Sequence, residues 1–165
     1  MRKAPLFIVL SLLLGFLLVT CGGEKGDTVK VGVIAELTGD MPAVGESCKK
    51  AAEMAAKEIN DAGGLEIGGK KYKVDLFVED NAGKAEQSAS AAQKLITQQK
   101  VTAIVGPNAS RYALPAAEIA ESGRTVLITP WSTAPKTTLD SRTGASKKYV
   151  FLTYYIISHF HFLKE

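Results

Sequence analysis

The sequence predicts an α/β fold, a doubly wound parallel sheet with helices on both faces. Apolar, β-branched segments of strand length alternate with segments whose apolar residues recur at helical spacing. The connections between these segments are only a few residues long, as expected where right-handed crossovers join parallel strands. The chain of 165 residues, 46% hydrophobic and 22% charged, has the size and composition of one globular domain.

Residues 1–20 are expected to be a signal peptide rather than part of the sheet. Arg2 and Lys3 precede an almost unbroken apolar run from Leu6 to Val19, which is the layout of a secretory signal and is short for a membrane span. The run leads to Cys21 and resembles the bacterial lipoprotein signal, in which this cysteine receives lipid. We therefore expect an exported, periplasmic or cell-surface protein that is anchored to the membrane through Cys21, with residues 21–28 as a tether.

The elements of the sheet follow in order after the tether. We predict strands at residues 29–35, 72–79, 101–105 and 126–129, and helices at residues 44–60, 84–99 and 112–121. The first strand, VKVGVIA, is apolar at nearly every position, as in a parallel strand covered on both faces. The first helix places Cys48, Ala51 and Ala55 on one side, and Gly63 and Gly64 end it.

Residues 29–140 form the predicted lobe, and the composition changes after them. Residues 149–163 (YVFLTYYIISHFHFL) are densely aromatic and apolar, unlike anything upstream. We therefore interpret residues 141–165 as a tail outside the lobe, the product of truncation or of a change of reading frame, with a diverged terminal strand as the alternative.

Charge and residue content exclude several classes of function. Removal of Arg2 and Lys3 with the signal peptide leaves 18 of the 20 basic residues against 17 acidic ones, a net charge of +1 that argues neither for nucleic-acid binding, which we do not expect, nor for a polybasic membrane surface. The two histidines, His159 and His161, have no further metal ligand nearby, so we expect no metal site. With Cys21 lipidated, Cys48 has no disulfide partner and is expected to be a small buried apolar residue.

Two enzyme motifs that the fold class can carry are also missing. The loop TGDMPAVGES joins a strand to a helix, but its glycines are spaced one residue too far apart and Glu46 stands where a phosphate loop needs lysine. Ser110 lacks the flanking glycines of a nucleophile elbow. We expect neither a cofactor nor enzymatic activity.

Ligands of an open α/β sheet collect beyond the carboxyl ends of its strands, where neutral hydrogen-bonding groups gather in this sequence. Ser110 falls at or just before the start of the third helix, where its hydroxyl and the free N–H groups can hold a carboxylate or where it can simply cap the helix. Pro130 ends the fourth strand, which leaves Trp131, Ser132 and Thr133 in the adjacent loop. The zwitterion of a free amino acid suits this arrangement, although turn formation and packing explain the same three residues.

The stretches VKVGVIAELTGDMPAVGESCKKAAEMAAKEINDAGGLEIGG, AIVGPNAS and VLITPWSTAPKTT together resemble the leucine/isoleucine/valine-binding proteins, the type I periplasmic receptors of branched-chain amino-acid ABC transporters. The resemblance covers residues 29–138. It implies the periplasmic binding protein type I fold, of which this chain is an incomplete N-terminal lobe. It also implies that Ser110, Trp131, Ser132 and Thr133 bind the α-carboxylate and α-ammonium of the ligand, that the loop around Val44 lines the side-chain pocket, and that the partner is an ABC permease.

The sequence departs from this family at three places. Some relatives carry a disulfide where Gly83 and Ala109 stand here, and several carry an aromatic residue at Val44. Family members also continue into a second lobe that covers the ligand, whereas this sequence leaves the family pattern after Phe151. We therefore expect weak binding, because the ligand stays in contact with water.

The leading hypothesis is thus an extracytoplasmic receptor for branched-chain or related amino acids. Two alternatives are a sensing or protein-interaction domain of the same fold without a transport role, and a flavodoxin-like enzyme, which would need a cofactor.

Overall fold

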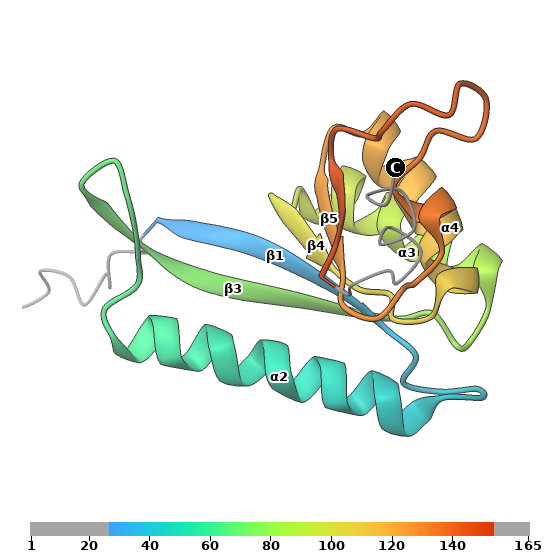
Figure 1. The fold of residues 1–165 in the computed structure, drawn as a ribbon. Coiled ribbons are helices and arrows are strands. Elements are labelled where there is room, and N and C mark those ends of the chain that lie inside the picture. The colour runs from blue at the N-terminus through green and yellow to red at the C-terminus, as the bar shows by residue number, and fades with distance from the viewer. Residues whose placement is uncertain (1–26, 154–165) are drawn as a thin grey trace, which may run out of the picture.

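The computed structural model describes residues 27–153, so the predicted signal peptide, Cys21 and residues 154–165 lie outside the described part (Figure 1). The described residues form one six-stranded sheet in the order β2-β3-β1-β4-β5-β6. Its strands are β1 (Thr28–Ala35), β2 (Leu65–Ile67), β3 (Lys70–Asp80), β4 (Ala103–Val105), β5 (Val126–Thr129) and β6 (Val150–Leu152). The predicted doubly wound sheet is confirmed.

Strand β1 lies inside the sheet between β3 and β4 and is parallel to both, with Val33 opposite Val78 of β3 and Val105 of β4. Strands β2 and β3 pair antiparallel as a hairpin, which the sequence did not predict. Gly68 and Gly69, both at positive φ, make its turn. The sheet is therefore mixed, with its antiparallel strand at one edge.

The helices cover the two faces of the sheet unequally (Figure 1). Helix α2 (Pro42–Asp61) runs along one face beside β1 and β3, whereas α3 (Ala85–Lys94) and α4 (Ser110–Ser122) pack together on the opposite face. The main hydrophobic core lies on the α3–α4 side, where Ile34, Leu95, Ile104 and Leu127 are fully buried. The α4 residues buried in this core are Ala116, Ala117 and Ala120, whose small side chains allow close approach of the helix to the sheet.

The predicted helix at residues 84–99 is interrupted near its end. It runs as α3 to Lys94 and continues as the π-helical segment Leu95–Gln99, which ends at Lys100 in the left-handed conformation. No helix within residues 27–153 combines the length and the apolar character that crossing a bilayer requires.

The predicted boundary of the lobe at residue 140 is wrong. Strand β6 pairs in parallel with β5, Val150 lies opposite Leu127, and Val150 is buried in the main core. The dense aromatic composition of residues 149–163 hid this short strand in the sequence. The lobe extends at least to Leu152, because the outer edge of β5 takes its hydrogen-bonding partner from there.

Candidate amino-acid site

The loops after β4 and β5 meet at the carboxyl edge of the sheet, as parallel neighbours must. Thr129, at the end of β5, donates from its hydroxyl to the carbonyl of Pro107 at 2.7 Å and fixes the two loops relative to each other. Across the same junction, the Ser132 hydroxyl donates to Ser110 Oγ at 3.1 Å and the Thr133 N–H donates to the same oxygen at 3.2 Å. The structure therefore brings Ser110, Ser132 and Thr133 together.

Ser110 does not cap its own helix. Ala109 occupies the N-cap position of α4, no side chain makes a capping hydrogen bond, and Ser110 is the first helical residue. Within residues 27–153 the N–H groups of Ser110 and Arg111 have no hydrogen-bond acceptor. Free N–H groups and the positive end of the helix dipole therefore lie beside the Ser110 hydroxyl, a combination that suits an anion.

The hydroxyl groups beneath this site form a chain that orients the Ser110 proton. Ser132 is completely buried, and its Oγ lies 2.8 Å from Thr137 Oγ1 and 3.1 Å from Ser110 Oγ. Each hydroxyl has one proton, so the donation of Ser132 to Ser110 requires Thr137 to donate to Ser132. Since Ser110 Oγ accepts from both Ser132 and Thr133, its own proton is free to point toward a ligand.

This geometry corrects the expected role of Ser132. The sequence suggested that it contacts the ligand directly, but its side chain has no exposed surface and is engaged with Ser110 and Thr137. Ser132 supports Ser110 from below. By contrast, Thr133 and Trp131 are exposed, and no donor within the described residues reaches the Trp131 carbonyl.

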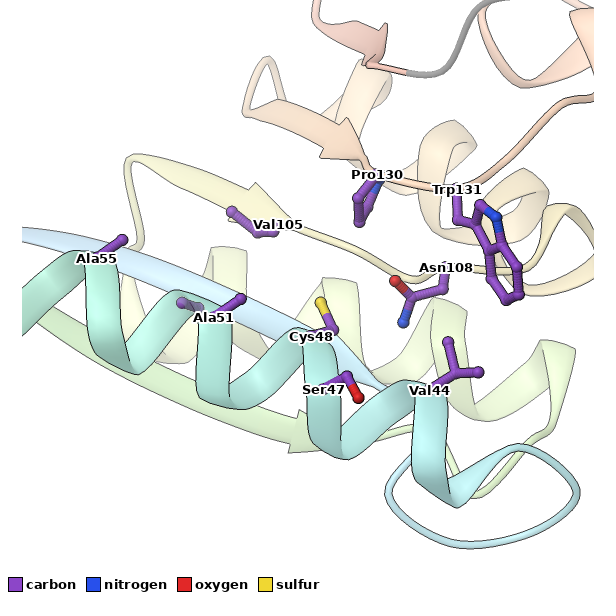
Figure 2. Close-up of a pocket in the computed structure, with 10 residues that line it drawn as sticks. Val44, Ser47, Cys48, Ala51, Ala55, Val105, Asn108, Pro130 and Trp131 are labelled. Atoms are coloured by element: carbon purple, nitrogen blue, oxygen red, sulfur yellow. The ribbon is translucent and has the colours of Figure 1, made fainter.

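An apolar groove of about 550 Å³ adjoins these loops between α2 and the ends of β4 and β5. Figure 2 shows Val44 and Cys48 on α2 pointing toward Pro130, Trp131 and Asn108 on the opposite side. The groove is lined by Val44, Ser47, Cys48, Ala51, Ala52, Ala55, Val105, Asn108, Pro130 and Trp131. Val44 and Trp131, predicted from distant segments, therefore share one apolar surface next to Thr133.

Glu36 is a supporting residue that the sequence reading missed. It follows β1 directly, is completely buried, and accepts from the N–H of Asn108 at 3.0 Å, from Asn108 Nδ2 at 2.6 Å and from the N–H of Ala109 at 3.4 Å. These bonds fix the loop that leads into Ser110. The available signal was a carboxyl residue immediately after an apolar strand. A carboxyl side chain is almost never fully buried without partners, so this position indicates hydrogen-bond donors from a neighbouring loop.

Hydrogen bonds of Asp80 connect the loops after β1 and β3. Its carboxylate accepts from the Thr38 hydroxyl at 2.6 Å and from the N–H groups of Leu37, Thr38 and Ala82 at 2.8–3.2 Å. Burial alone would raise the pKa of Asp80, but these bonds, led by the one from the Thr38 hydroxyl, bring it below its ordinary value. The carboxylate form therefore holds these loops together.

The remaining reactive side chain of the groove, Cys48, is not activated. Burial raises the pKa of its thiol, a hydrogen bond with Asn108 offsets part of this rise, and the charge of Glu36 adds to it. The thiol is therefore protonated at neutral pH and is a poor nucleophile. Residues 27–153 also contain no group of three or more His, Cys, Asp and Glu side chains placed to hold a metal ion.

Comparison with known proteins identifies the family. A family model described as periplasmic binding protein matches residues 28–158. The chain belongs to the periplasmic binding protein family. A Leu/Ile/Val-binding protein of Rhizobium johnstonii is 36% identical over 110 residues, which are 67% of this chain and 29% of that protein.

Solved structures of periplasmic binding proteins give the same result. The branched-chain amino acid transporter substrate-binding protein of Streptococcus pneumoniae, solved with isoleucine, has a TM-score of 0.67 and 34% identity over 76% of this chain and 33% of its own. A leucine-binding protein from Thermotoga maritima has a TM-score of 0.66 and 30% identity over 78% of this chain and 33% of its own. These comparisons confirm the resemblance seen in the sequence and the type I fold.

This periplasmic binding protein chain spans only about three-tenths of the length of the curated relatives it matches. The family consists of substrate-binding proteins rather than enzymes, and its location is extracytoplasmic.

Proposed function

We propose that this chain carries one wall of a binding site for a branched-chain or related amino acid, in the receptor component of an ABC importer. The observation that carries the proposal is the contact of Ser110, at the start of α4, with the Thr133 N–H across two loops. This contact places unpaired N–H groups, a hydroxyl proton and a free carbonyl within one small region. A zwitterion needs donors and acceptors in such proximity.

The two charged groups of the amino acid find complementary partners here. Its carboxylate accepts from the Ser110 hydroxyl and from the N–H groups at the start of α4, in line with the helix dipole. Its ammonium donates to the Trp131 carbonyl and to the Thr133 hydroxyl. Neutral groups satisfy both charges, so the site discriminates by geometry rather than by net charge.

The aliphatic side chain of the ligand then lies in the apolar groove between Val44 and Trp131. Trp131 is 48% exposed, and coverage by an aliphatic side chain removes apolar surface from water. Val44 is smaller than the aromatic residue that several relatives carry at this position. The space that it leaves in the groove favours branched side chains over short ones.

The affinity of the described lobe alone is expected to be in the millimolar range, about −4 kcal/mol. Hydrogen bonds that remain in contact with water contribute little, whereas tight sites bury most of the ligand surface. The second lobe that the family resemblance implies would exclude water from the other side.

Amide shifts in two-dimensional NMR spectra test the proposal. Leucine should shift the amide signals of Ser110 and Thr133 and the Trp131 indole signal in a saturable manner. Neither isopentylamine, which lacks the carboxylate, nor 4-methylpentanoate, which lacks the ammonium, should saturate the site. Ser110→Ala should lower the affinity for leucine about tenfold, the equivalent of one hydrogen bond to a charged group.

The matched control is Ser122→Ala, at the other end of the same helix, where the hydroxyl donates only to the Ile119 carbonyl. It should bind leucine like the original chain. The proposal fails if leucine leaves the signals of Ser110, Trp131 and Thr133 unchanged at millimolar concentrations, or if the two serine variants weaken binding equally.

Export and membrane anchoring through Cys21, and delivery of the ligand to an ABC permease, belong to the same proposal. They are supported by the signal-like residues 1–20 and by the extracytoplasmic location of the family. Radiolabelled palmitate should label the chain in a bacterial host, and Cys21→Ala should abolish the label. Equal labelling of both forms would contradict the anchor.

A further inference from the structure

Lys147 is a buried cation beneath the loop that follows β5. Its side chain has no exposed surface, although it carries an ammonium group. This group pairs with Glu118 Oε1 at 2.8 Å and donates to the carbonyls of Leu139 at 2.8 Å, Thr137 at 3.3 Å and Lys136 at 3.4 Å. A buried charge is stable only with partners of this kind, so Lys147 fixes the positions of Glu118 and of the segment that carries the three carbonyls.

Those partners come from two places that matter for the amino-acid site. The three carbonyls belong to residues 136–139, which overlap the 3-10 turn Pro135–Thr137 that follows Thr133. Glu118 lies on α4, the helix that begins with Ser110. Lys147 thus joins the turn behind Thr133 to the helix that carries Ser110.

The turn held by Lys147 contains the first hydroxyl of the chain that orients Ser110. Thr137, completely buried, donates to Ser132, which donates to Ser110. The Lys147 ammonium donates to the Thr137 carbonyl, and the backbone N–H of Lys147 donates to the Thr138 carbonyl at 2.7 Å. A displacement of this turn would move Thr137 Oγ1 away from Ser132. The directions of the hydrogen bonds among the three hydroxyls would then no longer be fixed.

We propose that Lys147 is a positioning residue for the amino-acid site: by holding the turn at residues 136–139 against Glu118, it fixes Thr137 so that the Thr137–Ser132–Ser110 chain leaves the Ser110 proton facing the ligand. The inference rests on the proposed function for its ligand. The contacts that carry it are independent of any ligand.

Lys147→Met tests the clamp, because it retains much of the side-chain volume and removes the ammonium. Amide hydrogen exchange at Ser132 and Thr133 should accelerate at least about tenfold, while exchange in the central strand, at Val33, should change much less. Lys148→Met is the matched control, since Lys148 is exposed and carries the same charge at the next position. Lys148→Met should leave exchange at Ser132 and Thr133 unchanged.

Thr137→Val and Thr137→Ser test the hydroxyl chain even if Lys147→Met does not fold. Valine has nearly the shape of threonine without the hydroxyl, whereas serine retains the hydroxyl. Leucine affinity, measured from the NMR shifts, should fall by up to about tenfold in Thr137→Val, because the Ser132 hydroxyl loses the partner that holds it against Ser110, and should return in Thr137→Ser.

The outcomes separate the inference from the proposed function. Exchange at Ser132 and Thr133 that matches Lys148→Met, or that rises equally at Val33, overturns the positioning role whether or not leucine binds. So does equal leucine affinity of the valine and serine variants. If leucine fails to bind the unmodified chain while the local exchange effect of Lys147→Met persists, the proposed function fails and Lys147 remains the residue that orders this turn.

Discussion

Replacement of Glu36 by alanine should be the most destabilising single change near the site that leaves all proposed ligand-contacting groups in place. Glu36 is completely buried at the end of β1, and its carboxyl oxygens accept three N–H groups from Asn108 and Ala109. Alanine removes the acceptors and leaves the donors where water has little access. The cost then comes from unsatisfied donors rather than from lost attraction.

The magnitude follows from the lengths of these hydrogen bonds. Two are short, 3.0 Å to the Asn108 N–H and 2.6 Å to Asn108 Nδ2, and the third, to Ala109, is long at 3.4 Å. Each unsatisfied buried donor costs about 1–3 kcal/mol, so the two short bonds together predict a loss of about 2–6 kcal/mol. Since a domain is stable by only about 5–15 kcal/mol, Glu36→Ala should lose a large fraction of the folded population.

Glu36→Gln separates the cost of unsatisfied N–H donors from the cost of lost side-chain volume, because glutamine has nearly the same volume as glutamate. Glutamine retains one oxygen for the Asn108 N–H but sets its own NH₂ group against Asn108 Nδ2. It therefore leaves about half of the donors unsatisfied and should cost about 1–3 kcal/mol.

Urea unfolding followed by circular dichroism measures these differences, with the slope m expected to stay constant. Glu58→Ala, on the exposed side of α2, is the surface control and should lie within about 0.5 kcal/mol of the original chain. The reasoning is refuted if Glu36→Ala is less than about 1 kcal/mol destabilising, or if Glu36→Gln costs as much as Glu36→Ala.

Two further perturbations address the neighbouring loops. Gly106→Ala should lower the free energy of unfolding by more than about 2 kcal/mol, because its φ is +88° and its new Cβ would lie 2.1 Å from the Ile34 carbonyl oxygen. Gly144→Ala, at φ +72° with nothing within 4 Å, bears only the backbone strain and should cost about 1 kcal/mol; equal melting temperatures of the two variants would contradict the steric argument. Asp80→Asn should be less stable than the original chain at neutral pH and equally stable in strong acid. The pKa of Asp80 is lower in the folded state, so the stability that its carboxylate contributes is complete above the ordinary value of 3.8 and disappears as the pH falls through the folded value. A difference in urea midpoint that does not change between neutral pH and strong acid would contradict this assignment.

The order of the elements was predictable because the relevant signals are local. The strand at residues 126–129 has the observed bounds, the first strand begins one residue earlier than predicted, and the first helix is longer by two residues at its start and one at its end. Periodicity, glycine turns and the proline after β5 act within a few residues of the chain. Local signals also placed Ser110 at the start of its helix and Thr133 just after a strand.

Strand partners and burial, by contrast, depend on segments far apart in the chain. Strand β6 was hidden among aromatic residues and is recognisable only because β5 offers it an edge. The apolar stripe of α2 was expected to be buried, but only part of it meets the sheet: Ala56 is buried, whereas Ala51 and Ala55 line the open groove.

The sequence by itself determined the doubly wound order of strands and helices and the residues that gather at its carboxyl edge. Only the tertiary structure decided which of them face outward: it turned Ser132 inward, enclosed Glu36 and Lys147, and left the Ser110 proton free. The physical reason is that a side chain's hydrogen-bonding state depends on partners contributed by other loops. Glu118 and Lys147, or Glu36 and Asn108, become neighbours only when the sheet and its helices pack.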